Sequence, residues 1–449
     1  MHLQNVHVPP HAIVSFVLDV VGVLGVAAIV VSPAVHLGSF EGAHVFSLKL
    51  FVVAMSAIFA AFVMGLYQRE FWGWRKLPPR LAIALAMSVI VAGGLSRIGT
   101  LSGNVWTEIL LVNILVFALI LLNRLICSLI GEKMKTPVLY FGSESGLAAL
   151  RKIERLRKLR TFSIDHEFSS AAVHDEGQLN ALFGAVNTSG AGAIVVGGTE
   201  ETMNRFATAF LSWRHVDVSV MPLSAFIENE TRRLDIYDPE AARQLTFYRT
   251  RRTGISRVAK RVGDILFALA FLVFTLPVTA LTCLLILILE GRPIFYHQER
   301  VGLGGRVFTL YKFRSMTVNA EADGIARWTT PSDNRVTSVG RILRLSRIDE
   351  IPQLFNVLRG DMSLVGPRPE RPSIVSDLQE KIPLYASRHS VPSGITGWAQ
   401  INFPYGASVE DAVAKTGYDL YYVKNASLLL DVVILLQTVR VILLGEGSR

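Results

Sequence analysis

Two adjacent acids close a segment that is rich in arginine. Asp349 and Glu350 follow three arginines, Arg341, Arg344 and Arg347. Apolar residues at 339, 342, 345 and 348 predict a short helix before the acids, and Pro352 predicts a break close to them. Asp349 could simply cap a second helix that runs through Gln353. The alternative is a reactive site in which the neighbouring cations keep both carboxylates ionised.

Cations suited to binding phosphate lie on either side of the acids. Arg368 stands between two prolines, which stiffen its backbone and suit its guanidinium to a bidentate grip on phosphate. Lys312 and Arg314 follow Gly304-Gly305, which are typical of a hairpin turn. In a strand the two cations share one face and would repel each other unless an anion lay between them, whereas a solvated edge strand is the alternative. Together with the acids, these cations indicate phosphoryl chemistry on a lipid phosphate.

The composition indicates a membrane protein. Of 449 residues, 51% are hydrophobic and 18% charged, and the mean hydropathy is +0.41. Disorder, collagen and coiled coil are excluded, and the two cysteines exclude a disulfide scaffold. Cys127 and Cys283 lie in apolar segments and are interpreted as packing residues. The net charge of +9 is expected to face membrane lipid and the cytoplasm, with no nucleic acid as partner.

Four apolar stretches precede the first polar region, at 12–32, 45–66, 80–100 and 106–130. Each is close to the roughly 20 residues that a helix needs to cross a bilayer. Basic residues concentrate after the second and the fourth stretch, so the positive-inside rule places the N-terminus and residue 131 onward in the cytoplasm. We therefore expect a four-span membrane α-helical bundle over 1–132.

Residues 136–248 have the pattern of an α/β domain. Apolar runs at 138–141 and 193–196 end in glycines and alternate with helical patterns, which predicts a small parallel, Rossmann-like sheet. The dinucleotide fingerprint, counted from Gly142, would need glycines where Glu144 and Leu147 stand. We therefore predict a structural or regulatory domain that binds no nucleotide. A membrane protein that senses a nucleotide through this domain is the alternative.

The remaining chain begins with a basic stretch, 249–263, which we interpret as a membrane-surface linker. The uncharged segment Ile265–Leu289 follows, with Pro277 at its centre and basic residues on both flanks. It could cross the membrane, or it could bend at Pro277 and leave by the face it entered. The C-terminal apolar run, Ser427–Leu444, is expected to lie against the membrane, with a buried core helix as the alternative.

Five motifs follow one another in this last region: Gln298–Gly302, Tyr311–Met316, Asp349–Leu358, Gly360–Pro369 and Gly394–Trp398. The ordered set resembles the bacterial sugar transferases, the monotopic phosphoglycosyl transferases. The spans and α/β domain resemble their long form, the polyprenyl-phosphate hexose-1-phosphate transferases. The stretch Phe403–Asp411, with Tyr418–Tyr422, is similar to the branch associated with exosortase-type exopolysaccharide clusters.

The resemblance implies transfer of a hexose-1-phosphate from a UDP-sugar, with UDP-glucose or UDP-galactose favoured, to undecaprenyl phosphate, with release of UMP and a requirement for Mg²⁺. It implies Asp349 as nucleophile and Glu350 as metal ligand. It also implies a set of phosphate-binding cations, namely Lys312, Arg314, Arg344 and Arg368. Attack by Asp349 would give an aspartyl-phosphosugar intermediate and ping-pong kinetics.

The resemblance also resolves the topology, because a cytoplasmic donor requires the motifs to face the cytoplasm. The helix would then re-enter the bacterial inner membrane and bend at Pro277, where Leu276 replaces the family's serine. The expected chain combines the four-span bundle, a cytoplasmic α/β Rossmann-like domain and a re-entrant-helix α/β catalytic domain over 264–449, in a possible homodimer. A catalytically inactive scaffold or regulator of polysaccharide assembly is the alternative function.

Overall fold

The computed structural model describes residues 2–3, 6–7, 13–22, 40–68, 76–98, 105–131, 136–156, 162–169, 176–198, 200–211, 218–237, 245, 254–318, 320, 333–403 and 408–445. The chain divides into two compact units, one formed essentially by His7–Phe226 and the other by Ile227–Arg449. Two short strands, β1 (His2–Leu3) and β2 (Val6–His7), pair near the N-terminus.

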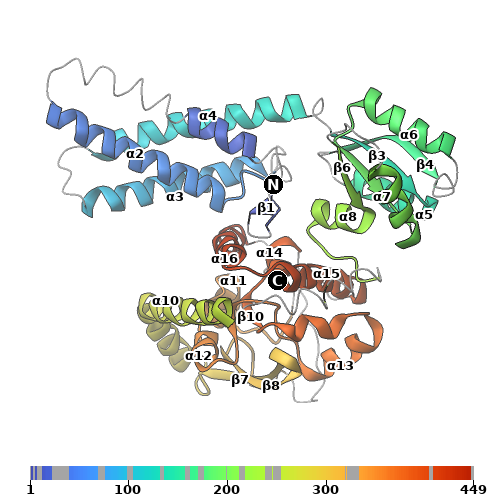
Figure 1. Ribbon diagram of the computed structural model, residues 1–449. Coiled ribbons are helices and arrows are strands. Elements are labelled where there is room, and N and C mark those ends of the chain that lie inside the picture. Colours follow the sequence, from blue (N-terminus) through green and yellow to red (C-terminus); the bar gives the residue numbers. More distant parts are fainter. Residues whose placement is uncertain are drawn as a thin grey trace. The chain divides into compact units, whose positions relative to one another are not determined.

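Long apolar helices open the first unit. They are α2 (Phe40–Val63), α3 (Leu77–Ile98) and α4 (Val105–Gly131), which pack on one another (Figure 1). Among the described residues of the whole chain, three helical stretches are long and apolar enough to cross a bilayer: Leu77–Leu95, Leu110–Cys127 and Ile255–Leu289. Of the four predicted N-terminal spans, the third and fourth therefore meet this test. The described parts of the first and second contain the shorter apolar stretches Ile13–Gly22 and Phe51–Val63, while the rest of the first span and the side chains of 40–50, in the first part of α2, lie outside what the structure describes.

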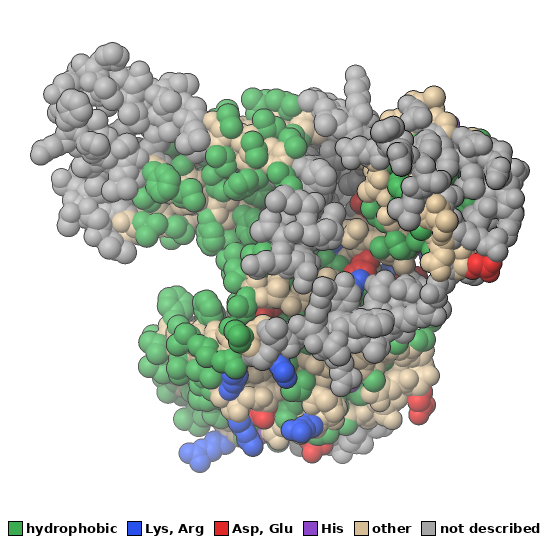
Figure 2. All heavy atoms as spheres, viewed as in Figure 1, with side chains coloured by type: hydrophobic (Ala, Val, Ile, Leu, Met, Phe, Trp, Pro, Cys, Tyr) green, Lys and Arg blue, Asp and Glu red, His purple; other side chains and the backbone are tan. Residues whose placement is uncertain are grey.

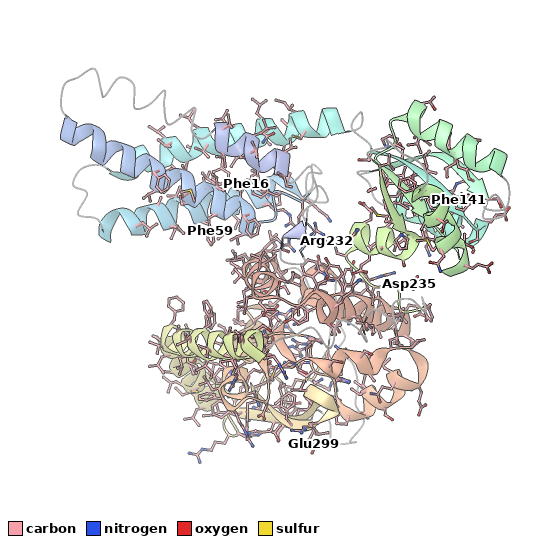
Figure 3. The ribbon with its side chains drawn as sticks, viewed as in Figure 1. Phe16, Phe59, Phe141, Arg232, Asp235 and Glu299 are labelled. Carbon is pink, nitrogen blue, oxygen red and sulfur yellow. The ribbon has the colours of Figure 1, made fainter. Side chains whose placement is uncertain are left out.

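A parallel sheet with helices on both faces completes the first unit, as predicted (Figure 1). Its strands, in the order β4-β3-β5-β6, are β4 (Phe162–Ser169), β3 (Thr136–Gly142), β5 (Ala193–Val196) and β6 (Ser219–Pro222). The helices are α5 (Glu144–Leu156), α6 (Glu176–Ser189) and α7 (Glu200–Leu211); α8 (Leu223–Thr231) follows β6 and spans the boundary between the two units. Alternate residues of β3 join different cores: Phe141 (Figure 3) packs with Phe206, and Tyr140 packs on the other face with Leu150.

The side chain of Tyr140 packs against the glycines at the carboxyl end of strands β3 and β5. A Cβ atom at Gly142, Gly146 or Gly197 would collide with the Tyr140 hydroxyl, which donates to the Ser143 carbonyl at 2.9 Å. These glycines make room for a phenol ring where a dinucleotide would need space for its phosphates. The Tyr140 ring therefore fills the space beside these three glycines.

The second unit carries the five motifs. After α10 (Gly254–Leu289) come the antiparallel strands β7 (Phe295–Val301) and β8 (Val307–Phe313), marked by Glu299 in Figure 3. Gly304 and Gly305 turn the hairpin with positive φ, as expected. Helices α11 (Ser338–Leu345), α12 (Gln353–Arg359), α13 (Pro372–Lys381), α14 (Trp398–Asn402), α15 (Val409–Asn425) and α16 (Leu428–Leu443) surround the parallel strands β9 (Ser363–Val365) and β10 (Gly394–Thr396).

Both halves of α10 pack on this unit, on either side of Pro277. Ala268 joins the main core beside Leu354, whereas Ile286 joins a second cluster with Phe313. A straight helix of 36 residues would be about 54 Å long. Around Pro277 the apolar side chains are largely exposed: Phe274 is 80% and Leu276 63% exposed, and hydrophobic side chains gather over α10 in Figure 2. Both ends of the helix thus contact the core of the second unit, and its apolar middle is largely exposed.

The C-terminal helix α16 is packed into the core along one face. Leu430, Ile434 and Val441 are buried in the main core, whereas Leu428 and Leu443 are about half exposed. The helix is therefore a core helix on one face, and its other face offers apolar surface.

Candidate active site

A tight turn presents the two acids to the interior. After α11, Arg347 adopts the left-handed region (φ 59°, ψ 14°), and Ile348–Glu350 forms a single turn of 3₁₀ helix. Helix α12 begins at Gln353, and its N-cap residue Pro352 makes no side-chain cap bond. The interpretation of Asp349 as a capping residue is therefore wrong. Both acids are buried, with Asp349 6% and Glu350 8% exposed.

Three cations surround Glu350. Its Oε1 accepts from Arg368 Nη2 at 2.6 Å and from Lys312 Nζ at 3.1 Å, and Arg347 Nη1 lies 3.7 Å from Oε2. Asp349 is held more loosely, since its nearest cation is Lys312, with Nζ 3.9 Å from Oδ2. The cations thus bind the Glu350 carboxylate closely and contact the Asp349 carboxylate only weakly.

The two carboxyl groups consequently differ in basicity. Burial acts to raise the pKa of Glu350, but Arg368, Lys312 and Arg347 together outweigh it and hold that pKa well below its ordinary value. The pKa of Asp349 is raised, chiefly by burial and further by the charge of Glu350, although Lys312 opposes the rise. Burial also lowers the pKa of Lys312, against the pull of both acids. Glu350 is the fixed anion of the pair, and Asp349 is the more basic group.

The predicted phosphate-binding residues do not all reach this pair. Lys312 and Arg368 contact it directly, and the charge of Arg344 acts on Asp349 from the last turn of α11. Arg314 lies elsewhere, one residue beyond the end of β8 at Phe313. Its buried guanidinium donates to the carbonyls of Glu290 and Gly291, where α10 ends.

Asn356, a motif residue without a predicted role, connects the strand of Lys312 with the helix after the acids. Its amide is fully buried and donates to the Thr309 carbonyl at 2.7 Å. Its Oδ1 accepts from the Tyr311 backbone N–H at 3.1 Å. These two bonds fix the register of β8 against α12, and with it the reach of Lys312 to the acids.

The Pro-Arg-Pro loop is held through its carbonyl groups. Gly394 N–H donates to Pro367 O at 2.9 Å, Arg388 Nη2 to Arg368 O at 2.9 Å and Arg300 Nη1 to Pro369 O at 3.1 Å. Sequence reasoning assigned no role to Arg388 or to its partner Asp419. The one available signal was an acid set among tyrosines in Tyr418–Tyr422.

The acid pair is a partial ligand set for a hard cation. Among the described residues no group of three or more His, Cys, Asp or Glu side chains could hold a metal ion. Mg²⁺ commonly takes one or two carboxylates and completes its shell with water and substrate phosphates. Asp349 and Glu350 fit that pattern, provided that a phosphorylated substrate supplies further ligands.

Comparison with known proteins identifies this part of the chain. Residues 255–445 match the family described as bacterial sugar transferase. Over 190 residues the chain is 47% identical to a UDP-N-acetylgalactosamine-undecaprenyl-phosphate N-acetylgalactosaminephosphotransferase of Aeromonas hydrophila, and the match covers 42% of this chain and 45% of that protein. It is 38% identical over 194 residues to a UDP-glucose:undecaprenyl-phosphate glucose-1-phosphate transferase of Escherichia coli (strain K12), covering 43% of this chain and 42% of that protein.

A shorter relative is covered almost completely. An uncharacterised sugar transferase of Bacillus subtilis (strain 168) is 43% identical over 196 residues, which is 43% of this chain and 91% of that protein. In contrast, the chain aligns with less than half the length of the Aeromonas and Escherichia proteins. The five motifs, the family match and this nearly complete coverage show that the chain belongs to the bacterial sugar transferase family.

Proposed function

We propose that the protein transfers a hexose-1-phosphate from a UDP-sugar to undecaprenyl phosphate and releases UMP. One observation carries the proposal: a basic carboxylate, Asp349, lies beside an anion, Glu350, that is neutralised by Arg368 and Lys312. The relatives named as undecaprenyl-phosphate sugar-1-phosphate transferases support the same general reaction.

In the first step Asp349 attacks the β-phosphorus of the UDP-sugar. A bond forms between a carboxylate oxygen and phosphorus, the bond from phosphorus to the bridging oxygen breaks, and UMP leaves with that electron pair. The enzyme then carries an aspartyl-phosphosugar. Asp349 suits this role because its raised pKa makes it the more nucleophilic carboxylate, and because no ion pair shorter than 3.9 Å holds it among the described residues.

In the second step an oxygen of undecaprenyl phosphate attacks the same phosphorus, and the Asp349 carboxylate leaves. Arg368 and Lys312 are placed to offset the negative charge that accumulates on the transferring group. Mg²⁺, held by Glu350 together with the substrate phosphates, would supply further charge neutralisation. Two chemical steps at one nucleophile give ping-pong kinetics.

The packing of α10 supports a proposal for the membrane arrangement. Because both of its arms pack on the catalytic unit while its apolar middle is exposed, we infer that it re-enters the membrane and bends at Pro277. The catalytic unit then lies on the cytoplasmic face of the bacterial inner membrane, after a four-span bundle. The reaction would be the first membrane step of exopolysaccharide synthesis, carried out by a homodimer in analogy with the long form.

The sugar is the part of the proposal that the site constrains least. The resemblance to the long form favours UDP-glucose or UDP-galactose, whereas the relatives are named for UDP-glucose and for UDP-N-acetylgalactosamine. A panel of these three donors therefore decides the substrate.

The test is UMP release by the purified protein with undecaprenyl phosphate, Mg²⁺ and each donor in turn, with Asp349→Asn as the paired variant. We expect lipid-dependent turnover of one donor by the native chain, and no UMP from the variant. Activity that survives Asp349→Asn would eliminate the covalent mechanism. A folded native chain that releases no UMP from any donor would favour the alternative, a scaffold or regulator, which the presence of Asp349, Glu350 and Arg368 in one site argues against.

A further inference from the structure

The loop that carries Arg368 has few backbone donors with which to anchor itself. Two of its residues, Pro367 and Pro369, have no N–H group. Each of the three successive carbonyls of Pro-Arg-Pro instead receives a hydrogen bond from outside the loop. The middle one is the carbonyl of Arg368 itself, and its donor is the guanidinium of Arg388.

Arg388 lies in a buried polar cluster. Its Nη2 also donates to Asp419 Oδ2 at 2.7 Å, and its Nη1 donates to the Tyr385 hydroxyl at 2.7 Å. The Arg388 side chain is 7% exposed and that of Asp419 is 3% exposed. The guanidinium carbon lies 5.0 Å from the centre of the Tyr385 ring. Asp419 and Tyr385 thus hold the planar guanidinium of Arg388, which donates its third hydrogen bond to the loop.

A buried ion pair is a poor device for stability alone, because desolvation of both charges offsets most of their attraction. A planar guanidinium whose orientation is fixed, however, holds the direction of its hydrogen bonds constant. We propose that Arg388, held by Asp419 and Tyr385, is a positioning residue that fixes the backbone of Arg368 and so directs the Arg368 guanidinium at Glu350 and at the transferring phosphate. This inference rests on the proposed function for its effect on turnover, but not for its effect on the loop.

The test uses the full-length protein in detergent or nanodiscs and the variant Arg388→Lys. Lysine keeps the charge beside Asp419, which favours folding, but cannot form the same three bonds from one plane. We expect kcat/KM for the UDP-sugar to fall roughly 10- to 100-fold, because displacement by about 1 Å of a group that stabilises the transition state has effects of this size. The matched control is Arg440→Lys, a change of another buried arginine, which is 1% exposed and donates to the Ile401 carbonyl; it is expected to retain activity.

A double-mutant cycle separates positioning from a general structural role. In an Arg368→Lys background there is no planar fork to direct, so Arg388→Lys should cause little further loss. The same fold loss in both backgrounds would show that Arg388 acts independently of Arg368, and would overturn the proposal.

Hydrogen exchange gives a second readout that needs no activity. Amides of the segment 366–371 should exchange faster in Arg388→Lys than in the native chain, whereas those of α16 should not change. Unchanged exchange in 366–371, or a rise throughout the unit, would overturn the positioning role. If the native chain released no UMP, the proposed function would fail, and the exchange result would still decide whether Arg388 holds the loop.

Discussion

Asn356 offers the sharpest test of how the site is assembled. We predict that Asn356→Leu destabilises the catalytic unit and separates Lys312 from the acids. The fully buried amide bridges the Thr309 carbonyl and the Tyr311 N–H. Leucine fills a similar volume but satisfies neither group.

The magnitude follows from these two bonds. Each buried backbone group left without a partner costs about 1–3 kcal/mol, and burial of the leucine offsets roughly 1–2 kcal/mol. The net loss is therefore about 3 kcal/mol, which corresponds to a fall of about 6–12 °C in Tm for a unit of this size. Turnover should fall about 100-fold at a temperature at which the variant is still folded, because the β8 hairpin loses its register against α12.

The assays are thermal unfolding of the purified protein and lipid-dependent UMP release. Asn402→Leu is the matched control, since the Asn402 amide makes one local bond, to the Trp398 carbonyl at 2.9 Å. If Asn356→Leu lowered Tm no more than Asn402→Leu and kept native turnover, backbone packing would set the register of β8, and the reasoning would be refuted.

Three further predictions concern stability. Gly197→Ala should destabilise the α/β domain by about 1–3 kcal/mol through overpacking, as measured by thermal unfolding. Adding Tyr140→Phe should restore most of that loss, because the Tyr140 hydroxyl is the atom nearest to the new methyl group. A double variant no more stable than Gly197→Ala would contradict this explanation. Burial and the charge of Arg388 lower the pKa of His389 to about 4, so stability present above pH 6.5 should be lost as the pH falls toward 4, by about 1–2 kcal/mol at pH 5. His389→Gln should flatten this dependence of Tm on pH, and an unchanged slope would count against it. Lys260→Met should lower the free energy of unfolding by about 3–5 kcal/mol, because it leaves the charge of the buried Asp431 without its cation, whose ammonium lies 2.7 Å from the carboxylate. The double variant with Asp431→Asn should recover part of this stability. A double variant no more stable than Lys260→Met would exclude this explanation.

The sequence was sufficient for the family and for the parallel sheet. Local patterns decide these features: strand–helix alternation predicts parallel pairing, and Gly304-Gly305 predicts the hairpin. The acid pair, Lys312 and Arg368 were identifiable because their motifs are contiguous and ordered. Apolar length alone also predicted α3, α4 and α10 as helices able to cross a bilayer.

Tertiary structure decided which of the candidate residues meet. Strand periodicity placed Arg314 beside Lys312, but β8 ends one residue earlier and Arg314 binds the carbonyls at the end of α10. The different basicity of Asp349 and Glu350 depends on which carboxylate the cations reach, and spacing along the chain does not encode that. Arg388 likewise comes to the carbonyl of Arg368 only through folding, because a hydrogen bond between residues 20 positions apart leaves no periodic trace in the sequence.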